Sequence, residues 1–211
     1  TVTASPLGSE AVPAKLTDWP ALMATLPVGR VMTAEGGWFT ADPNLGRLAR
    51  EAADAAQEKG MHLYLMDFIA DDEPIPAGSY WQSSTDWVGH RGNTQRNVEW
   101  VQKHVDRYGC FTVLSDGPNG LVAGSPELEV RAYPPYPCPK LVDSTGAGDM
   151  FRAGMLFGLE QGWELFKCLQ FASAAGSLKC RALGATTDVP TIAEIENLVS
   201  KHKAVSRHYE S

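Results

Sequence analysis

Residues 143–154 read DSTGAGDMFRAG, a polar turn with two glycines that runs directly into an apolar helix pattern. At such a junction several backbone N–H groups point at one spot, and the positive end of the helix dipole adds to their attraction for negative charge. That spot suits an anion, most naturally a phosphoryl group. A plain helix start would explain Gly146 and Gly148, but not the aspartates Asp143 and Asp149 that flank the turn.

The carboxylate of Asp149 is the unusual feature of this turn, because a bound phosphate would repel it. The acid has a role if it accepts the proton of a hydroxyl that attacks the phosphorus. In this interpretation the backbone N–H groups of Gly146, Ala147 and Gly148 hold the charge that develops on the transferred phosphoryl group. The turn therefore predicts phosphoryl transfer to an alcohol, with Asp149 as the base.

Strand and helix patterns alternate along the rest of the chain. We expect strands at residues 30–33, 61–66, 86–89 and 110–115, an antiparallel hairpin at 121–123 and 128–132, and a loop or short helix at 71–84. We expect helices at residues 45–59, 97–108, 149–161 and 164–179, and a last helix that opens with a capping box at 191–194. This alternation predicts an α/β fold with a mostly parallel sheet, helices on both faces, and ligands at the carboxyl ends of the strands.

Composition narrows the class of protein. The 211 residues carry a net charge of −7 and no basic run, which argues against nucleic acid as a partner. No apolar stretch is long enough to span a bilayer and the N-terminus lacks a secretory pattern, so we expect no membrane association. The four cysteines show no metal-site spacing, and Cys110 and Cys168 fall inside strand and helix patterns. We therefore expect buried free thiols and a reduced, cytoplasmic setting.

The stretch at residues 143–154 resembles the C-terminal signature of the ribokinase-like (PfkB) sugar kinases, whose pattern is close to D-[ST]-T-G-A-G-D-x-F-x-A-G. Every fixed position of that pattern is met. The resemblance implies a ribokinase-like three-layer sandwich, ATP and Mg²⁺ as cofactors, and a sugar or nucleoside-like molecule as the acceptor of the phosphoryl group.

Two further segments resemble parts of the family's nucleotide site. Residues 115–120 (SDGPNG) match a [TS]-x-G-x-x-G loop that approaches the phosphates, through Ser115, Gly117 and Gly120. An ordinary turn between two strands would also explain this loop. Ser173 occupies a helix position that often touches the adenine in the family, and close packing of small residues would explain it equally well.

The segment at residues 184–190 (GATTDVP) resembles the closing segment of the nucleotide site, with Gly184 and Ala185 as its contact residues. In the relatives this region supplies oxygen atoms for a monovalent cation, together with the segment that corresponds to Asp143 and Thr145. The resemblance therefore implies a K⁺ site that uses Asp143 and Thr145.

The chain departs from the family pattern in two places. Relatives carry an N-terminal portion with a sugar-contacting motif, several βαβ units and a β lid, whereas residues 1–29 here are typical of a loose lead-in. The resemblance covers residues 30–211, which we take as the C-terminal, nucleotide-binding portion of a ribokinase-like domain. Relatives also place an N-x-x-E motif, which organises Mg²⁺, where residues 89–93 read GHRGN. The missing glutamate leaves the handling of Mg²⁺ open.

Three functions stay open from the sequence. The chain is an active small-molecule kinase, or it is a truncated or inactive nucleotide-binding remnant of one, which the missing parts favour. An unrelated dinucleotide-binding protein is the third, and the lack of a G-x-G-x-x-G after the first strand counts against it. A sheet without its first strands would expose an edge, so we expect a second copy or a missing N-terminal half to cover it.

Overall fold

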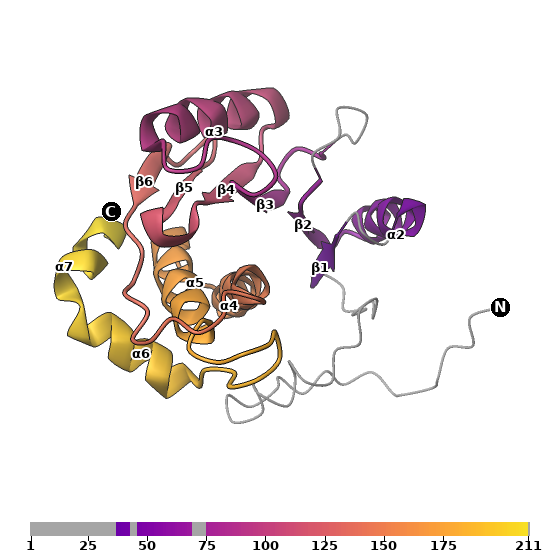
Figure 1. The fold of residues 1–211 in the computed structure, drawn as a ribbon. Coiled ribbons are helices and arrows are strands. Elements are labelled where there is room, and N and C mark those ends of the chain that lie inside the picture. The colour runs from indigo at the N-terminus through magenta and orange to yellow at the C-terminus, as the bar shows by residue number, and fades with distance from the viewer. Residues whose placement is uncertain (1–36, 43–45, 69–74, 211) are drawn as a thin grey trace, which may run out of the picture.

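A computed structural model describes residues 37–42, 46–68 and 75–210 (Figure 1). The predicted lead-in at 1–29 and the predicted strand at 30–33 lie outside the described residues. Within the described part, six strands form one sheet in the order in which they follow along the chain. They are β1 (Trp38–Ala41), β2 (His62–Met66), β3 (Tyr80–Ser84), β4 (Phe111–Ser115), β5 (Leu121–Gly124) and β6 (Arg131–Tyr133).

The sheet is mostly parallel. Strands β1, β2, β3 and β4 pair in parallel, whereas β5 pairs antiparallel with both β4 and β6. The predicted parallel sheet with an antiparallel hairpin is therefore confirmed. Because parallel strands end at the same edge, the carboxyl ends of β1 to β4 lie together, and this edge carries the candidate site.

Helices cover both faces of the sheet, as predicted (Figure 1). Along β2, Leu63 and Leu65 pack in the cluster that contains α2, while Tyr64 packs in the cluster that contains α4 and α5. This alternation follows from the two-residue period of a strand. The described helices are α2 (Arg47–Glu58), α3 (Thr94–Tyr108), α4 (Ala147–Glu160), α5 (Leu165–Lys179), α6 (Ile192–Lys201) and α7 (Lys203–Ser206), with short 3₁₀ turns η3 (Gly117–Asn119) and η4 (Arg207–Tyr209).

The segment around β3 was predicted wrongly. Residues 80–84 form a central strand rather than a loop or short helix, and residues 86–89 form a turn rather than a strand. The strand is hidden in the sequence because it is short, follows a proline-rich stretch, and ends in polar residues. Those polar residues are buried for a reason that only the fold reveals: Gln82 is 2% exposed and its side chain accepts a hydrogen bond from the Tyr64 hydroxyl. The short strand β1 was not predicted either.

Several element boundaries follow local capping. Helix α3 begins at Thr94, earlier than predicted, because the side chain of Asn93 accepts a hydrogen bond from the backbone N–H of Arg96. The predicted capping box at the start of α6 is present, with Thr191 and Glu194 bonding each other's backbone.

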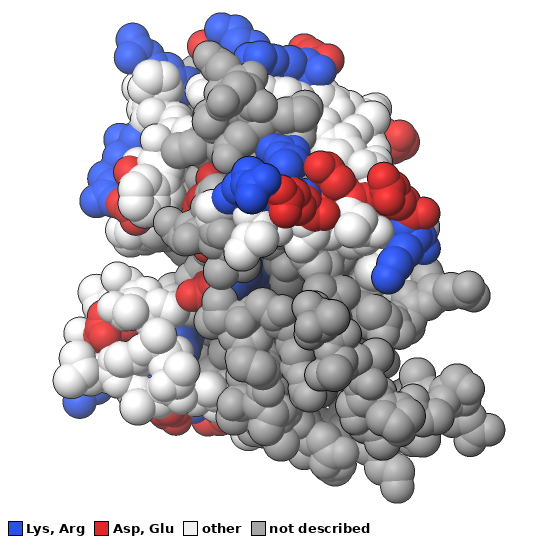
Figure 2. Space-filling view, turned by 90° about the vertical axis from the view of Figure 1, so that its right-hand side faces the viewer, with Lys and Arg blue, Asp and Glu red and all other residues white. Residues whose placement is uncertain are grey.

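Cys110 and Cys168 are buried and all four cysteines are free, as predicted. In the described part of the chain, no helix has the length and apolar character that a membrane crossing requires. On the described part of the face in Figure 2, basic side chains lie beside acidic ones.

Candidate active site

The turn that opens helix α4 lies against the carboxyl end of the sheet. Gly146 is the N-cap residue, in the left-handed conformation with φ of 81°, and Ala147, Gly148 and Asp149 are the first helical residues. The side-chain amide of Gln82 donates a hydrogen bond of 3.0 Å to the carbonyl oxygen of Gly148. The turn that is predicted to bind an anion is thereby attached to strand β3. Its N–H groups belong to the positive end of a helix of 14 residues.

Glycine is required at position 146 for two reasons. Its φ angle lies in the left-handed region, which side chains other than glycine rarely adopt. A Cβ atom there would also lie 2.9 Å from both the Cα atom and the carbonyl oxygen of Ala185. The structure therefore brings together the turn and the segment that begins with Gly184 and Ala185, two parts that the sequence places far apart.

The carboxylate of Asp149 is accessible and is oriented by an arginine. Its Oδ1 atom accepts a hydrogen bond of 2.8 Å from Nη2 of Arg152, and its side chain is 59% exposed. The Nη1 atom of Arg152 lies 3.5 Å from the hydroxyl of Thr40, on strand β1. Arg152 thus holds the Asp149 carboxylate beside the turn. Because this carboxylate is exposed, a ligand at this edge of the sheet can still contact it.

A second carboxylate, that of Asp67, is close enough to Asp149 for the two negative charges to act on each other. Asp67 follows β2 with a positive φ of 55°, and its Oδ1 atom accepts a hydrogen bond of 2.6 Å from the hydroxyl of Ser83. Burial raises the pKa of Asp67, the Ser83 hydrogen bond opposes that rise, and the negative charges of Asp42 and Asp149 add to it. Acids whose charges act on one another at the end of a sheet are typical of a functional site.

The loop at residues 115–120 lies at the same edge of the sheet. Ser115 ends β4, and its hydroxyl donates a hydrogen bond of 3.3 Å to the carbonyl oxygen of Ser83. Gly117 has a φ of 52° with open space where a Cβ would lie, whereas a Cβ on Gly120 would collide with the carbonyl oxygen of Tyr133. Of the three predicted contact residues, Gly117 therefore leaves the most room for a ligand, and Gly120 serves the turn into the hairpin.

The segment at residues 89–93, which lacks the family's glutamate, is joined to this loop. The buried carboxylate of Asp116 accepts hydrogen bonds from the Thr85 hydroxyl, at 2.7 Å, and from the Gly92 backbone N–H, at 2.8 Å. The exposed residue Arg91 forms an ion pair with Asp86. A cationic side chain thus lies beside the predicted phosphate loop, near the place where the family pattern has an acid.

Asp143 and Thr145 are brought together with the segment at 184–190. The Asp143 carboxylate accepts hydrogen bonds from the Gly184 backbone N–H, at 2.8 Å, and from the backbone N–H and hydroxyl of Thr145, at 2.9 and 2.7 Å. These hydrogen bonds, with that of Gly184 the strongest influence, lower the pKa of Asp143 to about 2. The carboxylate is a structural anchor between the two segments.

The hydroxyl of Ser173, the predicted adenine contact, has a partner inside the protein. It accepts a hydrogen bond of 3.0 Å from the hydroxyl of Tyr209, in the C-terminal turn η4, and Ser173 is 8% exposed. The structure therefore places Ser173 under the C-terminal turn, and its contact with a nucleotide base stays a prediction.

Sequence reasoning missed two residues that hold the turn in place, Gln82 and Arg152. Gln82 could have been noticed because it directly follows the aromatic pair Tyr80 and Trp81, residue types that favour strands. Arg152 lies inside the signature itself, three residues after Asp149, which is a spacing at which helical side chains meet.

The described residues contain no ready-made metal site. Among them, no group of three or more His, Cys, Asp or Glu side chains is arranged to hold a metal ion. Asp67 and Asp149 are oxygen donors of the type that Mg²⁺ prefers, but the first is bonded to Ser83 and the second to Arg152. The described side chains therefore fit Mg²⁺ that arrives with phosphate groups better than a resident Mg²⁺ ion.

Known sequences similar to this chain are carbohydrate kinases. Residues 84–192, more than half of the chain, match the pfkB family carbohydrate kinase description. An uncharacterized sugar kinase of Dictyostelium discoideum is 30% identical over 186 residues, which covers 77% of this chain and 52% of that protein. Aminoimidazole riboside kinase of Salmonella typhimurium is 28% identical over 200 residues, which covers 89% of this chain and 56% of that protein. The chain spans about half the length of these two relatives.

A solved structure shows the same fold. Ribokinase of Arabidopsis thaliana, complexed with ribose and ATP, matches with a TM-score of 0.59 at 23% identity, over 70% of this chain and 50% of that one. The likeness supports the ribokinase-like arrangement of sheet and helices. The match over residues 84–192, which contain the complete signature turn, establishes that the chain belongs to the pfkB family of carbohydrate kinases.

Proposed function

We propose that this chain is the nucleotide-binding portion of an enzyme that transfers a phosphoryl group from ATP to a hydroxyl of a sugar or nucleoside-like molecule. The observation that carries the proposal is the start of α4, where the left-handed Gly146 opens the helix beside the accessible carboxylate of Asp149. The relatives named as sugar and riboside kinases, and the ribokinase that holds ribose and ATP, support it.

The proposed chemistry follows from the charges at the turn. Asp149 accepts the proton of the attacking hydroxyl, and Arg152 keeps the carboxylate oriented while it does so. The N–H groups of Gly146 and Gly148 stabilise the charge on the transferred phosphoryl group, and donors of this type contribute about 3 kcal/mol each to lowering a barrier. The N–H of Ala147, which the sequence also assigned to this role, donates instead to the carbonyl oxygen of Ser144 at 3.0 Å. Asp67, whose carboxylate feels the negative charge of Asp149, favours a cationic neighbour such as the Mg²⁺ that accompanies ATP.

The nucleotide would lie between two loops. Its phosphates would meet Ser115, Gly117 and Gly120 on one side, and Gly184 and Ala185 would close the site on the other. In support of this placement, Ala185 packs against Gly146, and the hydroxyl of Ser115 and the carbonyl of Gly148 are both bonded to strand β3.

The setting of the enzyme is part of the proposal. The free cysteines fit the cytoplasm, where thiols stay reduced. The acceptor-binding side would be completed by a segment outside the described residues or by a second copy of the chain. Residues 30–211 would then act as one nucleotide-binding unit.

The first test is a calorimetric titration of Mg-ADP into the chain. Binding supports the proposal, and a turnover screen with sugars and nucleosides follows. No binding would mean that the signature survives only as structure, and the chain would then be an inactive remnant of a kinase.

The second test changes the proposed base. Asp149→Asn should lower turnover about a thousandfold, because general base catalysis is lost, while the affinity for Mg-ADP stays nearly the same. Asp54→Asn, an exposed acid on α2, serves as the matched control and should keep full turnover. An Asp149→Asn protein that is as active as the control would show that Asp149 is not the base.

A further inference from the structure

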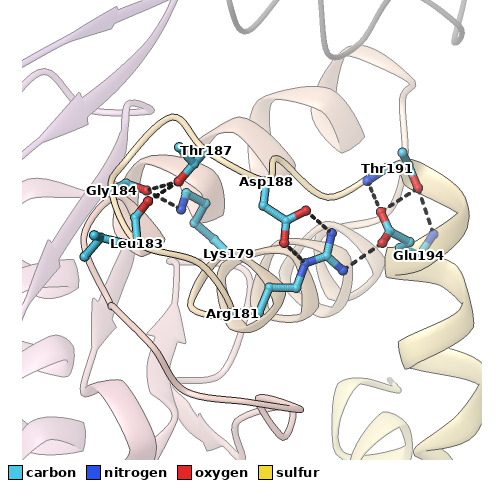
Figure 3. A network of polar contacts seen from close by, with 8 residues as sticks. All are labelled: Lys179, Arg181, Leu183, Gly184, Thr187, Asp188, Thr191 and Glu194. Carbon is cyan, nitrogen blue, oxygen red and sulfur yellow. Dashed lines mark hydrogen bonds and ion pairs between the residues drawn. The ribbon is translucent and has the colours of Figure 1, made fainter.

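The last residue of α5, Lys179, is completely buried, with 0% of its surface exposed. Lysine is almost never fully buried unless its charge has a partner, because desolvation of an ammonium group is costly. Its Nζ atom donates a hydrogen bond of 2.7 Å to the carbonyl oxygen of Gly184 (Figure 3). The lysine therefore brings a positive charge directly under the segment that closes the candidate nucleotide site.

This charge is linked to the start of α4 through a single residue. The carbonyl of Gly184 accepts from Lys179, while its N–H donates to the Asp143 carboxylate at 2.8 Å. The positive charge of Lys179 also contributes to the lowered pKa of Asp143, after the hydrogen bonds from Gly184 and Thr145. The next residue, Ala185, packs against Gly146. Lys179, Gly184 and Asp143 thus form a connected set below the anion-binding turn.

The oxygen atoms that the sequence assigns to K⁺ already accept hydrogen bonds. Both carboxylate oxygens of Asp143 are used, one by Thr145 and the other by Gly184. The Gly184 carbonyl accepts from Lys179, and the hydroxyl of Thr187 lies between it, at 3.1 Å, and the nearer carbonyl oxygen of Leu183. Three of the roughly four lone-pair sites of the Asp143 carboxylate are taken by these donors, and the Gly184 carbonyl is already bonded by an ammonium, so the described residues fit the ammonium group here better than K⁺.

The loop that covers Lys179 is held in place at its far end. Arg181 makes a bidentate ion pair with Asp188, at 2.6 and 2.9 Å, and a third contact of 2.7 Å with Glu194, whose carboxylate also caps α6 (Figure 3). Bidentate arginine–carboxylate pairs fix geometry as well as charge. The Gly184 carbonyl is therefore kept over the Lys179 ammonium.

We propose that the ammonium of Lys179 is the built-in monovalent cation of this site. It balances the charge of Asp143 and holds Gly184 and Ala185 against the turn at Gly146, a task for which the sequence resemblance implied K⁺. The inference rests on the proposed function, because it takes the turn as the site that binds the nucleotide. It follows that the chain needs no K⁺, and that removal of the ammonium creates a need for it.

The experiment measures Mg-ADP affinity by calorimetry and the melting temperature without nucleotide, each in KCl, NaCl and choline chloride at equal ionic strength. The wild-type chain and Lys103→Met, which removes an exposed lysine from α3, should behave alike in all three salts. Lys179→Met should bind Mg-ADP about tenfold more weakly in choline chloride, as for the loss of one charged hydrogen bond, and KCl should restore most of the loss. Its melting temperature should also rise specifically with K⁺.

Two results would overturn the inference: a wild-type chain whose binding or melting temperature rises specifically with K⁺, or a Lys179→Met chain that K⁺ does not rescue. Should Lys179→Met unfold in every salt, the wild-type salt series decides alone, since K⁺ independence supports the inference and a K⁺-specific gain contradicts it. Should the wild-type chain bind no Mg-ADP in any salt, the proposed function fails, and the melting temperatures still decide on the cation.

Discussion

Two loops of the molecule, the α5–α6 loop and the β3–α3 loop, place their charges in opposite ways. In the α5–α6 loop, residues 180–191, the cations lie inside: Lys179 is fully buried beneath it, and Arg181 is mostly covered by the acids that it binds. The β3–α3 loop, residues 85–93, is instead held by a buried anion of the neighbouring loop, Asp116, which accepts hydrogen bonds from the hydroxyl of Thr85 and the backbone N–H of Gly92.

The difference extends to the surface of the β3–α3 loop. The buried side chain of Asn97 bonds both the N–H and the carbonyl of His90, at 2.7 and 2.9 Å, so a neutral group fixes the backbone while His90 and Arg91 remain exposed. One loop is therefore stabilised by the ion pairs of a mostly covered arginine with two partly exposed acids, and the other by hydrogen bonds to neutral groups. The first should depend on each of its charges, whereas the second exposes one cation, Arg91, which is paired with Asp86.

The strongest test of this comparison removes the arginine of the α5–α6 loop. Arg181→Met leaves Asp188 and Glu194 without their cation, and we expect the free energy of unfolding to fall by about 2 kcal/mol, less than for a fully buried pair because both acids are partly exposed. Urea unfolding measures the loss.

A matched control for this change is Arg47→Met, which removes an exposed i,i+4 pair with Glu51 on α2. Such a surface pair contributes at most about 0.5 kcal/mol. If Arg181→Met costs no more than Arg47→Met, the α5–α6 loop does not depend on its internal charge, and the contrast between the two loops fails.

A smaller effect is expected in the β3–α3 loop. Asp116→Asn keeps one acceptor oxygen where Thr85 and Gly92 now use two, so we expect a loss of about 1 kcal/mol in the free energy of unfolding. Because Asp116 joins this loop to the predicted phosphate loop, the affinity for Mg-ADP should fall as well, by about fivefold.

Asp106→Asn is the control for this second change, since Asp106 is an exposed acid on α3 that accepts a hydrogen bond from the side chain of Gln102. It should leave both stability and Mg-ADP affinity unchanged. A loss of stability in Asp116→Asn with full nucleotide affinity would separate the β3–α3 loop from the binding site.

How much of the site could be predicted from the sequence depends on whether the residues that form it are neighbours in the chain. The turn at 143–149 is specified by local rules, since a left-handed glycine, a helix start and an acid in the first turn are all visible in consecutive residues. The fold class also follows from the alternation of strand and helix patterns, each with its own period. These features were confirmed because the residues that define them are neighbours in the chain.

The parts that were missed depend on contacts between distant residues. Strand β3 was hidden because Gln82 and Ser83 look like loop residues. Their partners, Tyr64 on the neighbouring strand β2 and Asp67 directly after it, are known only from the fold. The burial of Lys179 is likewise invisible, because its partner is a backbone carbonyl whose position depends on how the following loop folds back. A pattern of residue types carries no information on such pairings.

The smallest expected effect concerns acid. The hydrogen bond from Arg181, followed by that from the Thr191 backbone, lowers the pKa of Glu194 from 4.5 to about 2. A carboxyl group whose pKa is lower in the folded state binds fewer protons there than in the unfolded chain. Its contribution to stability is therefore complete above about pH 4.5 and is lost as the pH falls toward about 2. Since Glu194 is partly exposed, we expect that contribution to be about 1 kcal/mol.

This prediction is measured as a difference between two proteins. Urea unfolding of the wild-type chain and of Glu194→Gln should show a gap in free energy at neutral pH that shrinks as the pH falls below about 4.5, because protonated Glu194 binds Arg181 no better than glutamine does. Glu99→Gln, an exposed acid on α3, should show no such gap at any pH. A gap for Glu194 that persists unchanged in acid would mean that the carboxylate serves α6 only as a neutral cap, and that Arg181 holds the α5–α6 loop through Asp188 alone.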